Sequence, residues 1–289
     1  MIAPQFIHNV TNSFTLWADH ILLSRGFAYT NVTGALTKYT DGRLPDSYSA
    51  WGAPHKEWVL DSSITGAVIP SGFHVDGSFA PRGDDFSLDF INGRVISSGT
   101  ASSAVVTGSY CVKDFNIYNS NQDEESLIIE VCQNQLTPQN TIGTNISAPY
   151  LPPYTQKIPA IFINTETQVN KPLALGGTDS SEVRFNMIVF AHDPYQLDGV
   201  LGLFADTGDE VFKELPLEAA PVNQWGDIKG GYYNYNELVA ASGTNNIFID
   251  EARASKITDS LRRGLKTELY IGVIDFTLAQ YRSPRAPTS

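Results

Sequence analysis

Five histidines are the side chains in this chain best suited to metal binding or acid–base chemistry, and they are scattered. No HxxxH or HxH spacing occurs among His8, His20, His55, His74 and His192. A metal site needs three or four converging donors, and no local motif supplies them. We therefore interpret the histidines as structural or solvated, and the sequence predicts no metal.

Other residue types that could carry catalysis also lack a motif. The carboxylates of residues 206–210 look like a fragment of a calcium loop, but the alternating oxygen ligands and the distant glutamate of an EF-hand are missing. There is no GxSxG elbow, no phosphate-cradling glycine loop, and no local base beside Cys111 or Cys132. We predict no catalytic residue, no cofactor and no enzymatic activity. An enzyme whose groups converge only in three dimensions stays open as an alternative.

Composition and charge narrow the class of protein. The 289 residues are 42% hydrophobic and 17% charged, which is typical of a folded globular chain. The net charge of −12 opposes binding to nucleic-acid phosphates. No apolar stretch reaches the roughly 20 residues that cross a bilayer, and the N-terminus lacks the pattern of a secretory signal. We expect no membrane association, and two cysteines that are core residues rather than a disulfide framework.

The first half of the chain predicts one helix and then β-structure. Apolar residues recur at helical spacing over residues 12–25, with Asn12 or Ser13 as the N-cap. Residues 27–58 show no sustained period and are interpreted as an aromatic-bearing extended arm or loop. Asn92-Gly93 between two strand-forming runs predicts a hairpin with a type I′ turn. Two further strands are predicted at residues 105–118 and 126–133, which together suggest a small sandwich or barrel.

The second half predicts an α+β unit. Residues 134–157 carry four prolines and almost no charge, which favours a linker. Strands are predicted at residues 158–168, 183–193, 247–256 and 268–281, and a helix at residues 196–212. Asp193 before Pro194 is the predicted N-cap of that helix.

The predicted fold class is therefore α+β, with an N-terminal helix and antiparallel β-module followed by a helix packed on an antiparallel sheet. The predicted segments are an N-terminal helix and arm, a β-rich module, a proline-rich linker and an α+β domain. Their limits are residues 1–57, 58–133, 134–157 and 158–289.

Aromatic residues are the most suggestive candidates for function. Large amphipathic side chains in ordered loops are common anchors of subunit interfaces, although core packing accounts for many of them. The candidate contact residues are Trp17, Tyr48, Trp51, Tyr150, Tyr154, Trp225, Tyr232, Tyr233 and Tyr235.

Two stretches resemble virion structural proteins of tailed bacteriophages. The stretch VDGSFAPRGDDFSLDFINGRVISS at residues 75–98, followed by VVTGSYCVKDFNIY at 105–118, is similar to β-modules of small neck and tail proteins. The second stretch joins KIPAIFINTETQ, VRFNMIVFAHDPYQLDGVLGLFADTGDEVF and TELYIGVIDFTLAQYR. Its hairpin, helix and return strand are similar to tail-terminator and tail-completion proteins. The resemblance covers about two thirds of the chain in pattern, and it carries over no individual site residue.

The resemblance implies a homo-oligomeric ring in the head–tail connector or neck of a virion, assembled in the host cytoplasm. The implied partners are copies of the chain itself and neighbouring neck, portal, tail tube or sheath proteins. DNA would be only cargo passing through an acidic channel that repels its phosphates. Two alternatives stay open: a receptor- or carbohydrate-binding protein of a baseplate or tail fibre, and a hydrolase with dispersed carboxylates.

Overall fold

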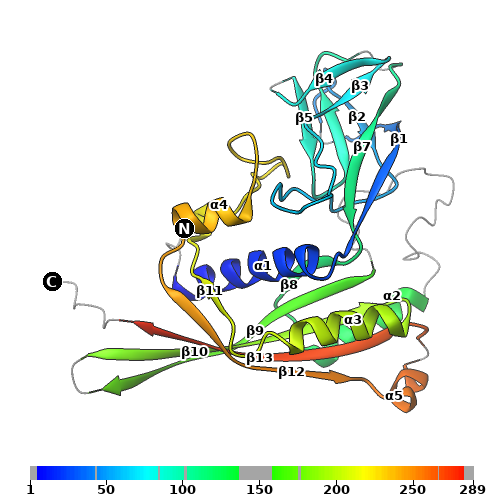
Figure 1. The fold of residues 1–289 in the computed structure, drawn as a ribbon. Helices are drawn as coiled ribbons and strands as arrows, with labels where there is room; N and C mark the ends of the chain where they lie inside the picture. The colour runs from blue at the N-terminus through cyan, green and yellow to red at the C-terminus, as the bar shows by residue number, and fades with distance from the viewer. Residues whose placement is uncertain are drawn as a thin grey trace.

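The computed structural model describes residues 5–282 except 43, 84, 101–102, 137–157, 175–176 and 266. The protein is α+β: an N-terminal helix is followed by two largely antiparallel sheets, the first of them nearly barrel-shaped (Figure 1). The first sheet forms the upper part of the molecule in Figure 1 and the second forms the lower part. Helix α1 lies between them.

Helix α1 spans Phe6–Ser24, so it begins six residues before the predicted start. Phe6 and Val10 extend the buried apolar stripe upstream of Phe14 and Trp17. Neither predicted N-cap occupies that position: the Ser13 hydroxyl donates to the Asn9 carbonyl inside the helix, at 2.6 Å. The predicted start is too late because the polar residues His8 and Asn9 separate Phe6 and Ile7 from Val10. These two polar side chains are exposed and half-buried, respectively.

The first sheet has seven strands in the order β4-β3-β7-β1-β2-β6-β5. Their bounds are β1 Tyr29–Tyr39, β2 Ser49–Gly52, β3 Gly72–Val75, β4 Ser78–Pro81, β5 Phe86–Asp89, β6 Arg94–Ser97 and β7 Val106–Lys113. The interpretation of residues 27–58 as an arm or loop is therefore wrong, because β1 and β2 lie in the middle of the sheet. Buried and exposed side chains do not alternate regularly along β1. Its sequence therefore lacks the apolar–polar alternation by which a strand is recognised.

The hairpin predicted at Asn92-Gly93 is confirmed, but its turn is longer than a type I′ turn. Asp89 pairs with Arg94, which leaves four connecting residues. Gly93 has a φ of +60°, whereas Asn92 does not have a positive φ. Glycine is also required by space, since a Cβ at this position would lie 2.1 Å from the His55 carbonyl oxygen.

The second sheet has six strands in the order β11-β12-β13-β10-β9-β8. Their bounds are β8 Asn116–Ser120, β9 Ala160–Ala174, β10 Thr178–Ala191, β11 Val211–Lys213, β12 Asn246–Lys256 and β13 Tyr270–Arg282. All neighbours are antiparallel except β8 and β9. The strands predicted in the second half are confirmed in kind, with β9 and β10 forming a longer hairpin than expected. The predicted strand at residues 105–118 is divided between the two sheets as β7 and β8.

Helix α2, Glu124–Leu136, replaces the strand predicted at residues 126–133. Its buried side chains Leu127, Ile128, Val131 and Cys132 recur at helical spacing and cover one end of the second sheet. A short apolar run cannot by itself separate a buried strand from a buried helix. The predicted linker begins within the last turn of α2, and residues 137–157 lie outside the described part of the chain.

Helix α3, Pro194–Ala205, packs Leu197, Val200, Leu201 and Phe204 against β10, β12 and β13. It ends seven residues before the predicted limit, because Asp209 has a positive φ and Val211 begins β11. In the described part of the chain after α3, three shorter helices are found: η1 Leu217–Ala219, α4 Tyr235–Ser242 and α5 Asp259–Gly264.

The predicted N-cap of α3 is confirmed and supports a stability test. The Asp193 carboxylate accepts a hydrogen bond from the Gln196 amide at 2.8 Å, and Pro194 occupies the first helical turn. Replacing Asp193 by alanine is expected to lower the free energy of unfolding by about 1 kcal/mol, measured by urea denaturation. The matched variant Asp193→Asn keeps a capping oxygen and should retain most of the stability; equal losses in both variants would contradict the cap.

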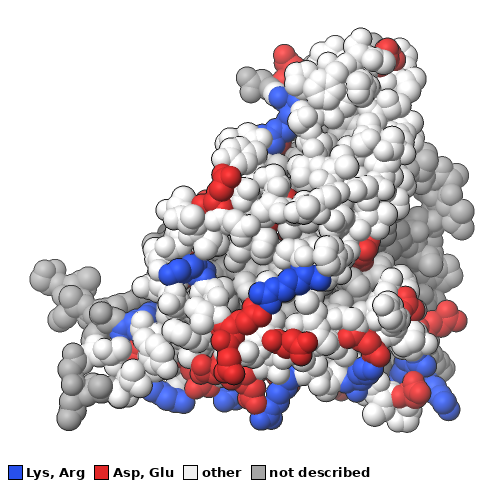
Figure 2. Space-filling view, in the orientation of Figure 1, with Lys and Arg blue, Asp and Glu red and all other residues white. Residues whose placement is uncertain are grey.

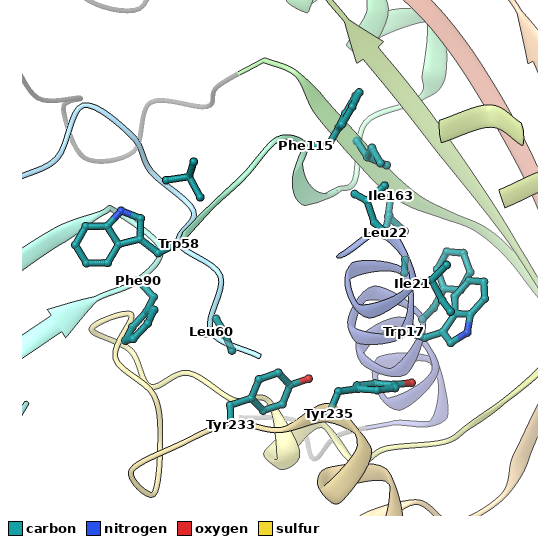
Figure 3. Packing of buried hydrophobic residues seen from close by; sticks show 14 of the residues in the cluster. Trp17, Ile21, Leu22, Trp58, Leu60, Phe90, Phe115, Ile163, Tyr233 and Tyr235 are labelled. Atoms are coloured by element: carbon teal, nitrogen blue, oxygen red, sulfur yellow. The ribbon is translucent and has the colours of Figure 1, made fainter. Parts of the chain in front are cut away.

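One apolar core joins the two sheets through α1. In Figure 3, Ile21 and Leu22 of α1 and Ile163 of β9 lie on one side of the cluster, and Trp58 and Phe90 lie across from them on the first-sheet side. The predicted boundary between residues 57 and 58 does not separate two structural units. Strands β1 and β2 pair with β7 and β6, which lie beyond this boundary.

Candidate assembly surface

Four of the nine predicted contact aromatics belong to the core, so their prediction as exposed contact residues is wrong. Trp17, Trp51, Tyr233 and Tyr235 are buried within the chain. Trp17 stacks on Phe212 with ring centroids 5.1 Å apart. Side chains that fill the core of a single chain cannot serve as exposed anchors for a neighbour.

Three of the nine are exposed, namely Tyr48, Trp225 and Tyr232. Tyr150 and Tyr154 lie outside the described residues. Trp225 lines a cavity together with residues of the first sheet. The Tyr232 hydroxyl donates a hydrogen bond to the Glu237 carboxylate at 2.7 Å.

Buried ionic groups connect α1 to the first sheet. Asp61 is buried and accepts hydrogen bonds from His20 at 2.9 Å and from the Tyr235 amide at 3.0 Å. These bonds and those from Ser63 outweigh the cost of burial and hold the pKa of the Asp61 carboxyl below its usual value. Lys113 pairs with Asp19 of α1 at 2.7 Å. The arrangement fixes α1 in place through partnered charges.

Both cysteines, Cys111 and Cys132, are free and buried. Burial raises the pKa of the Cys111 thiol to about 11, so it is protonated near neutral pH. Within residues 5–282, apart from the gaps, no three His, Cys, Asp or Glu side chains are grouped to hold a metal ion. No helix in this part of the chain is long and apolar enough to cross a membrane.

A surface that the sequence analysis missed is a three-stranded arm at one end of the second sheet. We define the arm as residues 167–174 of β9, 178–184 of β10 and 277–282 of β13, which pair antiparallel with one register shift between Thr178 and Asp179. Figure 1 shows β9 and β10 extending away from the helices at the left of the molecule.

The two faces of the arm differ. On one face the first turn of α1 reaches the arm, where the Phe6 ring lies 3.6 Å from the Arg282 guanidinium carbon. The pairing places Val169 and Tyr281 on the other face, and Leu173 is unpaired at the register shift; all three side chains are exposed. Helix α2 covers only the far end of this second face, around Phe162 and Ile188. The Tyr281 ring lies 5.7 Å from that of Phe248 in β12. The arm thus presents three large side chains with apolar surface that are each more than 40% exposed.

Charged groups lie among these apolar side chains. Glu182 of β10 pairs with Lys171 at 3.0 Å and with Arg184 at 3.3 Å. Figure 2 shows that acidic and basic side chains gather on the lower part of the visible face, over the second sheet. The upper part, formed by the first sheet, shows few. The visible face is thus richer in charged side chains over the second sheet than over the first.

Strand spacing in the sequence could have signalled the arm. The pair Gly176-Gly177 stands between two mostly polar runs, residues 164–172 and 178–182, and is typical of a hairpin turn. The prediction ended the strand at residue 168, where the apolar residues stop.

Comparison with known proteins identifies no family: the chain matches no protein-family model, and no curated protein is significantly similar to it.

Proposed function

We propose that the protein is a non-enzymatic structural subunit that forms an oligomeric ring in the head–tail connector or neck of a tailed-phage virion. The role within the neck would be that of a terminator, stopper or tail-completion protein. The observation that carries the proposal is the exposed apolar face of the arm. The likeness to a terminator-like domain rests on the resemblance of the sequence at residues 157–168, 183–212 and 267–282.

A strand ribbon of this kind needs a second layer. Hairpins that pack on nothing are marginal in water, and clustered apolar side chains on a surface mark contact sites. Val169, Leu173 and Tyr281 would gain burial from a partner laid on this face. The contact is expected to use the face rather than the edge, because Pro172 on β9 removes a backbone donor from the outer edge.

Copies of the same chain are the proposed occupant. A contact between the arm of one subunit and a different surface of the next is heterologous, and repetition of such a contact about an axis closes a ring. The acidic net charge of −12 suits a channel through which DNA passes as cargo. Neighbouring portal, neck, tail tube or sheath proteins would be the further partners, with assembly in the host cytoplasm.

The experiment is the mass of the full-length protein in solution, with and without a charge on the arm. Leu173→Asp is expected to weaken subunit association at least tenfold, because it places a carboxylate in an apolar contact. Leu261→Asp on α5 is the matched control, since Leu173 is 56% exposed and Leu261 54%. Light scattering and mass photometry over a concentration series would measure the effect.

The wild-type chain and the Leu261→Asp variant should give the same multi-subunit mass. A wild-type protein that stays monomeric at high concentration, and is absent from purified virions by mass spectrometry, would contradict the proposal. Equal dissociation of both variants would show that the arm is not part of the subunit interface.

A further inference from the structure

A cavity of about 520 Å³ lies between the first sheet and the loop that precedes α4. Figure 1 shows this loop rising from α4 toward the strands of the first sheet. The cavity is lined by residues that include Asp41, Lys56, Asp89, Asn92, Arg94 and Trp225. Its volume falls within the roughly 300–1,000 Å³ that small-molecule sites occupy.

The floor of the cavity is a closed network of buried charges. The Arg94 guanidinium donates to Asp89 and to Asp41, each at 2.7 Å, and to the Tyr39 hydroxyl at 2.9 Å. Asp89 also accepts from the backbone amide and the side-chain amide of Asn92. Such a network holds its members in one geometry, so the floor is pre-organised.

Trp225 stands at this cavity on a rigid turn. The Asn223 side-chain oxygen accepts from the Trp225 amide at 2.8 Å and from the Asp227 amide at 3.3 Å. The Gly226 carbonyl accepts from the Phe90 amide at 3.0 Å, and Gly226 packs so closely that a Cβ would lie 2.1 Å from the Asp89 carboxylate. The turn is therefore fastened to the first sheet, yet the Trp225 side chain is 64% exposed.

The lining groups indicate the chemistry of a ligand. Two cations, Arg94 and Lys56, balance the carboxylates of Asp41 and Asp89 in the lining. Burial raises the pKa of the remaining acidic group, Glu57, to about 7, so the cavity has no strong excess charge with which to select an anionic or cationic ligand. A single indole face supplies a flat apolar platform. Amide groups of Asn92 and Gln224 stand beside it as neutral hydrogen-bonding partners.

We propose that this cavity binds a neutral saccharide whose sugar ring stacks on Trp225. A pyranose has an apolar C–H face that fits an indole, and a rim of hydroxyls that both donate and accept hydrogen bonds. The Asn92 and Gln224 amides and the Lys56 ammonium are the partners for those hydroxyls. The site is independent of the arm and adds a binding activity to the proposed structural role.

The test uses the full-length protein and defined sugars. The chain is first screened on an array of neutral glycans, and then titrated with maltohexaose, cellohexaose and chitohexaose by calorimetry and tryptophan fluorescence. Trp225 is the exposed one of four tryptophans, since Trp17, Trp51 and Trp58 are buried. Binding is therefore expected to shift the emission of Trp225 to shorter wavelength.

Trp225→Ala is expected to weaken binding at least tenfold, and Asn92→Ala to weaken it less. Tyr232→Ala is the control, because Tyr232 is as exposed as Trp225 but does not line the cavity. Failure of every neutral glycan to bind the wild-type chain would overturn the proposal, as would unchanged binding by Trp225→Ala. A loss of subunit association in Trp225→Ala would instead make Trp225 an interface residue and also overturn it. Neither result bears on Leu173, so the arm and the cavity are tested separately.

Discussion

Replacing Trp58 by alanine is expected to lower the free energy of unfolding by about 3 to 5 kcal/mol, since the change removes a large buried aromatic side chain. Trp58 is fully buried. Its indole stacks on Tyr110 and Phe73 with ring centroids 4.7 and 5.5 Å apart, and meets Phe90 edge-on at 6.2 Å. The indole N–H also donates to the His55 carbonyl at 3.2 Å, so the variant leaves a cavity and loses a hydrogen bond.

Urea denaturation followed by far-ultraviolet circular dichroism measures this loss without relying on tryptophan emission. Trp225→Ala is the matched control, because it removes the same side chain from an exposed position and should change stability by less than about 0.5 kcal/mol. Equal denaturation midpoints for the two variants would show that Trp58 is not a central core residue.

Glu57→Gln is expected to stabilise the protein at alkaline pH and to have little effect at acid pH. Glu57 is buried, and desolvation raises the pKa of its carboxyl from 4.5 to about 7, partly opposed by the nearby Lys113 charge. The folded state therefore holds a proton that the unfolded chain releases above its lower pKa. The resulting stability is fully present below pH 4.5 and is lost as pH rises through 7.

The size of the effect follows from the shift. Between pH 5 and pH 8 the wild-type protein should lose about 2 to 3 kcal/mol relative to Glu57→Gln, which has no proton to release. Denaturation curves of both proteins at several pH values would measure the difference. Glu218→Gln on η1 is the exposed control and should follow the wild-type profile. A constant difference between wild type and Glu57→Gln across this range would contradict a proton held by Glu57.

Glu57 and Trp58 lie at the end of residues 27–58, the segment that was predicted to be an extended arm or loop. Glu57 has a positive φ of 50°, and its backbone bonds to Ile91 and Lys113 on either side. Trp58 bridges to Val112 of β7. A segment without a repeating pattern can thus be central, because its order comes from contacts with strands that are distant in sequence.

Elements with local signals could be predicted from the amino-acid sequence. The 3.6-residue repeat of Phe14, Trp17 and Ile21 predicted α1, the Asn92-Gly93 pair predicted a hairpin, and Asp193-Pro194 predicted the start of α3. These signals depend on periodicity, positive φ and capping, which neighbouring residues specify. The α+β class followed from the same signals.

The tertiary structure alone decides which apolar and aromatic residues are buried. It therefore also decides where the candidate sites lie. Trp51 and Trp225 occupy similarly irregular sequence, yet one fills the first sheet and the other stands exposed beside a charged cavity. The run around Ile128 became a helix because it packs against Phe162 and Phe190. Burial is a property of contacts between distant segments, and local pattern does not encode which segments will meet.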